Sequence, residues 1–240
     1  MAFWEQGELK IHYEESGSGF PVLLFAPGGM HSAMGVWDRM PWNPIEVLSD
    51  HFRVIAMDQR NAGESRGPIG AQDGWGTYAQ DHLALLDELG IDCCHVLGCC
   101  SGGSYGLGLI EAAPSRVAGA VLIQPIGHSE ENRDAFYAMF DAWADDLRPA
   151  RSEVSESDWA GFRARMYDGD FVVNVSRDFV RGVEHPLLVL MGNDLYHPET
   201  ISREIADLAP RAQLIETWKE GPAVAASAQQ VVAFLQTHTP

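Results

Sequence analysis

The sequence predicts an α/β fold in which a mostly parallel central sheet is flanked by helices. Short, continuously apolar segments alternate with helix-like segments along most of the chain, and this alternation is typical of β-α-β units. The apolar segments end in turns rich in glycine and polar residues, as strands buried on both faces of a parallel sheet do. The 240 residues, 46% of them hydrophobic, are enough for one sizeable core.

The strands are expected where these apolar segments occur. The chain opens on a pattern typical of a hairpin, with strands at residues 2–5 and 10–14 around a turn at Gln6 and Gly7. The buried strands that follow are expected at residues 21–25, 52–57, 95–98, 117–124, 186–191 and 213–216.

Helix signals lie between the later strands. Thr77 and Gln80 form a capping-box pattern at the start of one helix, and Gly90 is typical of its C-terminal end. Pro114 ends a second helix, and Pro198 stands in the first turn of a third. We expect helices at residues 77–89, 101–113, 198–208 and 223–235.

Residues 129–182 interrupt this alternation, because they contain no convincing buried strand. Two apolar stripes with helical spacing occur instead, one of Phe136, Met139, Phe140 and Trp143 and one of Trp159, Phe162 and Met166. We therefore expect a core of residues 1–128 and 183–240 with a small helical cap insertion at 129–182. The stripes either only anchor the cap to the core or also roof an apolar substrate pocket.

Charge and hydropathy exclude several classes of partner. The 16 Lys and Arg against 34 Asp and Glu give a formal net charge of -18, which repels nucleic acid and anionic lipid headgroups. No apolar run approaches the ~20 residues of a membrane span, and the first ten residues lack the pattern of a signal peptide. We therefore expect neither a nucleic-acid nor a membrane partner.

The four cysteines stand as two adjacent pairs, Cys93-Cys94 and Cys99-Cys100. Secreted scaffolds scatter their cysteines to link distant loops, so this clustering favours a reduced, cytoplasmic protein. Neighbouring residues of a strand project to opposite faces of the sheet. Because the four thiols could then not converge on one ion, no metal site is expected.

The strongest chemical signal is the segment at residues 95–103, which reads HVLGCCSGG. It combines a strand, a sharp turn and a helix, and it matches G-x-S-x-G with Cys100 in place of the serine. Gly98 and Gly102 suit a turn in which side chains would clash with neighbouring backbone. Placing the nucleophile at Ser101 instead fits less well, because Cys99 and Gly103 would then occupy the small-residue positions. The N-terminus of the following helix is expected to acidify the Cys100 thiol.

The chain resembles the α/β-hydrolase family over nearly its whole length. Residues 27–29 (PGG) resemble the family's oxyanion loop, residues 58–65 (DQRNAGES) its D-x-R-G-x-G-x-S turn, and residues 194–198 (DLYHP) its acid-bearing loop. The resemblance implies that the backbone N–H groups of Gly29 and Ser101 form an oxyanion hole.

The chain departs from this family at the catalytic histidine, which normally follows the last strand. The corresponding residues 218–222 read WKEGP. Two histidines on strand-end loops are the candidate replacements: His197, next to Asp194, and His128. Asp194 is expected to orient the base or to position the substrate. A cysteine tolerates the loss of the usual histidine better than a serine, because a thiol at a helix N-terminus can ionise without an adjacent base.

The sequence therefore favours a hydrolase with Cys100 as nucleophile, His197 as base and Asp194 as its orienter, with His128 as the alternative base. Its substrate is expected to be an ester, thioester or lactone of a small apolar acid, with apolar or aromatic character, and no cofactor is implied. Two alternatives stay open: a catalytically degenerate, ligand-binding member of the fold, and a non-hydrolytic lyase or acyltransferase. The sequence also leaves a homodimer open.

Overall fold

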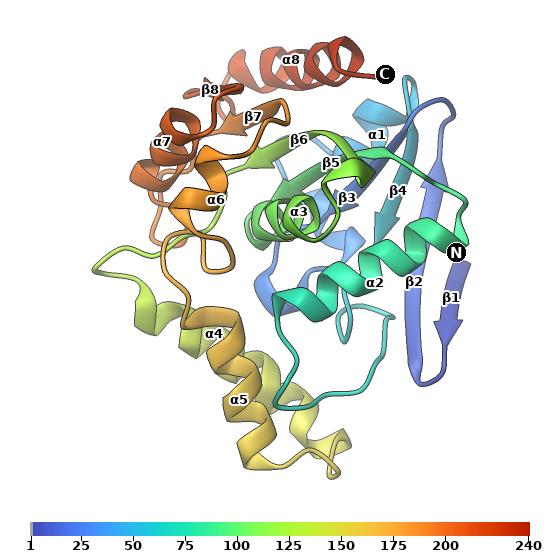
Figure 1. Cartoon of the computed structure of the whole chain (residues 1–240), viewed down its shortest axis with the longest axis vertical. Coiled ribbons are helices and arrows are strands. Elements are labelled where there is room, and N and C mark those ends of the chain that lie inside the picture. Colours follow the sequence, from blue (N-terminus) through green and yellow to red (C-terminus); the bar gives the residue numbers. More distant parts are fainter. Residues whose placement is uncertain (1) are drawn as a thin grey trace.

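The computed structural model describes residues 2–240 and contains one eight-stranded sheet (Figure 1). The strand order is β1-β2-β4-β3-β5-β6-β7-β8. The first two strands pair antiparallel, β2 pairs antiparallel with β4, and the strands from β4 to β8 are parallel. The strands are β1 (Ala2–Gln6), β2 (Leu9–Ser16), β3 (Pro21–Phe25), β4 (Arg53–Met57), β5 (Cys94–Cys99), β6 (Val117–Ile123), β7 (Leu187–Leu190) and β8 (Ala212–Ile215).

Helices cover both faces of the sheet, which confirms the predicted fold class. On one face lie α2 (Trp75–Glu88), α3 (Ser101–Ala112) and α7 (Glu199–Leu208), and on the other lie α1 (Pro44–Ser49) and α8 (Ala223–Thr237). The short α6 (Arg177–Arg181) packs on α7. Each face therefore has its own hydrophobic core.

Strand β3 illustrates why the buried strands read as unbroken apolar runs. Leu23 and Phe25 pack in the core on the α2 and α3 side, whereas Val22 and Leu24 pack in the core on the α1 and α8 side. All four side chains are fully buried. Because successive side chains of a strand point to opposite faces, a strand covered on both sides needs an apolar residue at every position.

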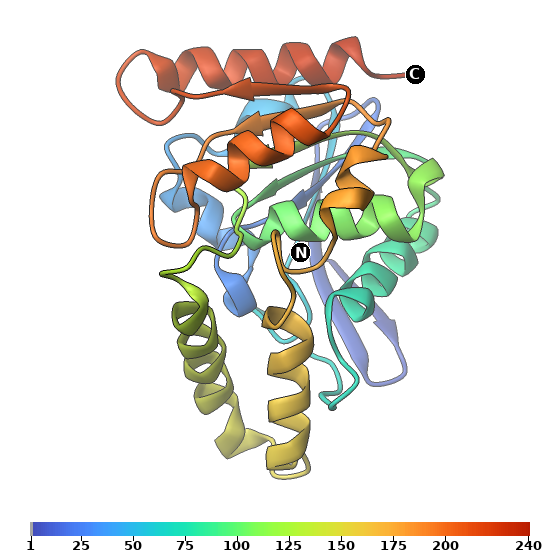
Figure 2. The ribbon, with the colours of Figure 1, turned by 60° about the vertical axis from the view of Figure 1, so that its left-hand side comes forward.

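The segment between β6 and β7 contains helices and, within the described chain, no strand. Helices α4 (Arg133–Leu147) and α5 (Glu156–Tyr167) form a pair that projects beyond the sheet (Figure 2). The two apolar stripes face each other across this pair: the rings of Phe140 and Phe162 are 5.3 Å apart, and those of Trp143 and Trp159 are 5.8 Å apart. The aromatic stripes thus bind the cap helices together.

One local expectation is wrong, and one helix was not expected. Helix α2 begins at Trp75, with Gly74 as its N-cap residue, so Thr77 is not the cap. Thr77 instead lies inside the first turn, where its hydroxyl accepts a hydrogen bond from the Gly74 N–H. Helix α1 was not expected from the sequence, although Asn43 caps it by accepting from the Ile45 N–H and Pro44 occupies the first helical position, a common start signal.

Candidate active site

Cys100 stands on the sharp turn between β5 and α3. Its backbone adopts φ 61° and ψ −122°, a strained conformation for a residue with a side chain. Two hydrogen bonds hold this turn: the Cys100 N–H donates to the Ile123 carbonyl at 3.0 Å, and the Gly103 N–H donates to the Cys100 carbonyl at 3.1 Å. The residue as a whole is partly exposed, and it packs against the cores on both faces of the sheet. The turn therefore presents the thiol above the strand ends.

The glycines on either side of this turn leave room for close backbone contacts. A Cβ on Gly98 would lie 2.0 Å from the Gly102 carbonyl oxygen, and a Cβ on Gly102 would lie 2.2 Å from the Phe25 carbonyl oxygen. Both obstacles are backbone atoms of central elements, which cannot move aside. The expectation that a side chain at these positions would clash with neighbouring backbone is confirmed.

His197 and Asp194 lie together on the loop after β7. The Nδ1–H of His197 donates to Asp194 Oδ1 at 2.7 Å. The same oxygen accepts the backbone N–H groups of Tyr196 at 3.0 Å and His197 at 3.1 Å. A Cβ on Gly192 would lie 2.5 Å from the Cβ of His197. A glycine at this position therefore allows the His197 side chain to pack closely against the backbone of residue 192. Only 11% of the His197 side chain is exposed.

This arrangement directs the second ring nitrogen of His197 to the nucleophile turn. Because Nδ1 carries the proton that Asp194 accepts, the neutral ring has an unprotonated Nε2, which is the tautomer of a base. This Nε2 is buried and makes no well-aligned hydrogen bond within residues 2–240. It lies close enough to Cys100 for the two groups to shift each other's pKa. Such contacts often align fully only when substrate is bound.

The pKa shifts favour a thiolate–imidazolium pair. Burial alone would raise the pKa of the Cys100 thiol, but His197 and the N–H groups of Gly28 and Ser101 outweigh burial and lower it. Burial would likewise lower the pKa of His197, but Cys100 and Asp194 together raise it. Partial burial would raise the pKa of Asp194, but the hydrogen bond and charge of His197, together with the backbone N–H groups of His197 and Tyr196, lower it. The three groups therefore act electrostatically as one unit.

The backbone N–H groups that act on the Cys100 sulfur come from two segments of the chain. The N–H of Ser101, at the start of α3, and the N–H of Gly28, after β3, both stabilise the thiolate. Gly28 stands one residue before Gly29, the position expected from the sequence; Gly29 itself lies under the cap, where an added Cβ would be 2.5 Å from the Met139 sulfur. The structure thus places the cap helix α4 directly over the loop.

His128 points to the cap. Its Nε2–H donates to the Tyr167 carbonyl at 2.9 Å, and its ring packs edge-on against Phe136 at 5.3 Å between ring centres. The structure therefore brings His197, and not His128, into electrostatic contact with Cys100. The sequence favoured His197 and kept His128 as the alternative base, because both residues lie on loops that follow strands.

Alkylation should single out Cys100 among the four cysteines. Iodoacetamide near neutral pH is expected to modify Cys100 first, because burial raises the pKa of Cys94 to about 12 and that of Cys99 well above its ordinary value. Burial also raises the pKa of Cys93. The rate of Cys100 modification should rise with pH through a pKa below that of an ordinary thiol, because His197 and nearby N–H groups lower the Cys100 pKa.

Peptide mapping by mass spectrometry gives the modified positions, and the Cys100→Ser protein is the control in which only slow labelling at Cys93 should remain. Faster labelling of Cys93 or Cys99 than of Cys100, or no labelling of Cys100 below pH ~9, would contradict the assignment of the turn.

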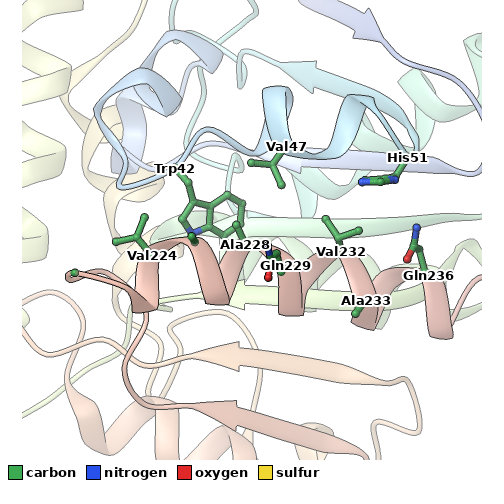
Figure 3. Close-up of a pocket in the computed structure, with 11 residues that line it drawn as sticks. Trp42, Val47, His51, Val224, Ala228, Gln229, Val232, Ala233 and Gln236 are labelled. Atoms are coloured by element: carbon green, nitrogen blue, oxygen red, sulfur yellow. The ribbon is translucent and has the colours of Figure 1, made fainter.

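A large cavity lies away from this site. It has a volume of about 740 Å³ between α1 and α8 (Figure 3), on the face of the sheet opposite α3. Its lining residues are Trp42, Val47, His51, Gly221, Val224, Ala225, Ala228, Gln229, Val232, Ala233 and Gln236. None of them belongs to the Cys100 turn, so this cavity is separate from the candidate active site.

Metal-binding and membrane-spanning features are absent from residues 2–240. No cluster of three or more His, Cys, Asp or Glu side chains in this range has the arrangement needed to hold a metal ion. Among the same residues, every helix is too short or too polar to cross a bilayer.

Comparisons with known proteins agree with this architecture. A family model described as the alpha/beta hydrolase fold matches residues 21–182. The putative carbamate hydrolase RutD of Azorhizobium caulinodans is 33% identical over 123 residues, which are 51% of this chain and 44% of that protein. The chain thus spans less than half the length of this relative.

A longer match is the 2-hydroxy-6-oxo-2,4-heptadienoate hydrolase of Pseudomonas putida, 27% identical over 216 residues that cover 78% of this chain and 76% of that protein. Among solved structures, the enol-lactonase from Burkholderia xenovorans has a TM-score of 0.71 at 24% identity, covering 95% of this chain and 97% of that chain. The esterase from Thermogutta terrifontis has a TM-score of 0.70 at 21% identity, covering 96% and 95%. The structural likenesses show a shared fold.

Proposed function

The chain belongs to the α/β-hydrolase fold family, and on this premise we propose that it is a hydrolase whose nucleophile is Cys100. Its substrate is an ester, thioester or lactone of a small apolar acid. The observation that carries the proposal is the array at the strand ends, in which Asp194 holds His197 at 2.7 Å and His197 shifts the pKa of the Cys100 thiol downward.

In the first half-reaction, the Cys100 thiolate attacks the carbonyl carbon of the substrate and forms a carbon–sulfur bond. The negative charge that develops on the carbonyl oxygen is stabilised by backbone N–H groups of the Gly28 loop and Ser101. Collapse of this intermediate breaks the bond to the leaving alkoxide or thiolate. The imidazolium of His197 donates its Nε2 proton to that leaving group, which leaves an acyl thioester on Cys100 and a neutral imidazole.

In the second half-reaction, neutral His197 accepts a proton from water as the water oxygen attacks the thioester carbonyl. The carbon–sulfur bond then breaks, the acid is released and the thiolate–imidazolium pair is restored. Asp194 accepts the Nδ1–H of His197 throughout, so it fixes the ring orientation and stabilises the positive charge on the ring. The net reaction consumes one water. It yields one acid and one alcohol or thiol from an ester or thioester, and a single hydroxy acid from a lactone.

The apolar character proposed for the acyl group is supported by the cap. Met139 lies over Gly29, and Phe136 and Phe140 are fully buried on the same helix. Relatives named as hydrolases of a carbamate and of an oxo-dienoate support hydrolysis of a small organic molecule. A pocket lined mainly by apolar groups with few polar ones is typical of such sites.

Intact-protein mass spectrometry tests the proposal. When the protein is mixed with 4-nitrophenyl butyrate, we expect a rapid release of nitrophenolate together with a mass increase equal to one butyryl group. The adduct should map to the peptide that contains Cys100 and should decay as acid forms, because only covalent catalysis leaves such an intermediate. Steady turnover without any adduct, or an adduct on another residue, would contradict Cys100 as the nucleophile.

A further inference from the structure

Three tyrosines from three different elements meet on the core side of the nucleophile turn. Tyr78 comes from α2, Tyr105 from the second turn of α3 and Tyr167 from the last residue of α5. The rings of Tyr78 and Tyr105 are 5.1 Å apart, and Trp75 bridges the group, at 5.0 Å from Tyr105 and 6.3 Å from Tyr167. The cap and the core thus each contribute a phenol to one cluster.

The hydroxyl groups of these tyrosines have no hydrogen-bond partner within residues 2–240. Exposure is 1% for Tyr78, 2% for Tyr105 and 0% for Tyr167, and none of the three hydroxyl oxygens has a hydrogen bond to any residue among 2–240. A buried hydroxyl without a partner destabilises a fold, and most buried polar groups are therefore hydrogen-bonded. Three such hydroxyl groups close together indicate a binding site for a polar group of a ligand.

The cluster lies next to the nucleophile. Tyr105 follows Ser101 by one helical turn, and both Tyr105 and Tyr167 are close enough to Cys100 for its charge to raise their pKa, after the larger effect of burial. The same burial raises the pKa of Tyr78. All three phenols therefore stay protonated and act as hydrogen-bond donors.

We propose that the hydroxyls of Tyr105 and Tyr167, with Tyr78 behind them, form a subsite that binds an oxygen atom in the acyl part of the substrate. This inference rests on the proposed function, because it places the subsite beside the carbonyl that Cys100 attacks. Its occupant is a neutral acceptor, a keto oxygen. Arg60, the cation whose charge acts on the pKa of Tyr78, already donates two hydrogen bonds to Asp81 at 2.8 and 2.6 Å. It is therefore not free to balance a carboxylate.

Matched probes test this subsite. The 4-nitrophenyl esters of 4-oxopentanoate and 5-oxohexanoate carry the keto oxygen, and those of pentanoate and hexanoate lack it. We expect kcat/KM to be higher for a keto probe than for its parent. Tyr105→Phe and Tyr167→Phe should each lower this ratio of kcat/KM values about tenfold. In both variants, turnover of the parent probes, which lack the keto oxygen, should fall less than turnover of the keto probes. Tyr137→Phe is the matched control, since its hydroxyl donates to Asp168 at the surface of the cap.

Thermal unfolding gives a second readout that does not depend on activity. If the hydroxyls await a ligand, Tyr105→Phe and Tyr167→Phe should leave the Tm unchanged or raise it by about 2–4 °C. A lower Tm in both variants would mean that the hydroxyls have a structural role and would overturn the proposal. Equal losses with keto and parent probes would overturn it as well.

Calorimetric binding of the free acids separates this inference from the proposed function. The Cys100→Ala protein should bind 5-oxohexanoate or 4-oxopentanoate more tightly than the parent acid, and Tyr167→Phe should abolish the difference. If no ester is turned over but this preference is present, the hydrolase proposal fails and the subsite stands. If acyl-enzyme forms but neither turnover nor binding distinguishes the probes, the subsite fails alone. Tighter binding of glutarate than of either keto acid would overturn the assignment of a neutral oxygen.

Discussion

Replacing Cys100 by alanine is expected to lower turnover of 4-nitrophenyl butyrate by a factor on the order of 10⁴–10⁶, as removal of a nucleophile does in other covalent hydrolases. The substitution removes the only atom that the proposal allows to bond to the acyl group. It leaves the turn intact, because hydrogen bonds hold the strained backbone at φ 61°: the N–H of residue 100 donates to the Ile123 carbonyl, and its carbonyl accepts from the Gly103 N–H. The loss should therefore appear in activity and not in the Tm.

Cys93→Ala is the matched control for this experiment. Cys93 is a partly exposed thiol just before β5, at the end of that strand opposite the Cys100 turn, so its removal should leave turnover within about twofold. The acyl mass adduct should persist in Cys93→Ala and vanish in Cys100→Ala. If Cys100→Ala keeps full turnover, covalent catalysis at this turn is wrong. The alternatives of a ligand-binding protein or a lyase that uses the pocket for proton transfer would then replace it.

The fold could be predicted from the sequence because its signals are local. A strand covered on both faces must be apolar at each position, and the run at residues 21–25 shows this directly. The turn at Cys100 could be found for a similar reason: its glycines reflect backbone clashes within a few residues. The start of α2 was missed because the capping position is a glycine, Gly74, which carries no side-chain signal, while Thr77 offers a misleading one.

The rest of the site depends on contacts between distant segments. No sequence pattern could show how far either the His197 or the His128 ring lies from Cys100, because the direction of each loop decides this distance. The Gly192 backbone and the Asp194 carboxylate turn one ring to Cys100, while the Tyr167 carbonyl holds the other ring at the cap. The three tyrosines could not be predicted for the same reason, since α2, α3 and α5 bring them together only after folding.

Under the proposed function, the proximity of Asp194 and His197 gives a physical account of a site that has no histidine in the segment directly after β8, residues 218–222. That position is occupied by the buried Trp218, whose indole N–H donates to the Met191 carbonyl at 2.8 Å. A single loop after β7 supplies both the carboxylate and the imidazole, three residues apart. Under the proposed function this loop performs the role that two loops share when the histidine follows the last strand.

Replacing His197 by alanine is therefore expected to lower kcat/KM for 4-nitrophenyl butyrate by about 10²–10⁴-fold, the usual contribution of a general acid–base. Two changes add to this loss: the leaving group is no longer protonated, and the Cys100 thiol loses the neighbour that lowers its pKa most. The pH at which iodoacetamide alkylation of Cys100 reaches half its maximal rate should rise in His197→Ala. A residue with a purely structural role would not move that pH.

His128→Ala tests the alternative base in the same assays. The substitution removes the hydrogen bond from His128 to the Tyr167 carbonyl, and we expect a small effect on turnover. The pH profile of Cys100 alkylation should not change, because His128 does not contribute to the pKa shift of Cys100. A larger loss of turnover in His128→Ala than in His197→Ala would reverse the assignment.

If neither substitution matters while Cys100→Ala abolishes turnover, the thiol acts without an imidazole partner. The N–H groups of Gly28 and Ser101 would then be the remaining source of its acidity, and release of the acyl group would rest on unassisted water, which predicts an acyl-enzyme that accumulates and decays slowly.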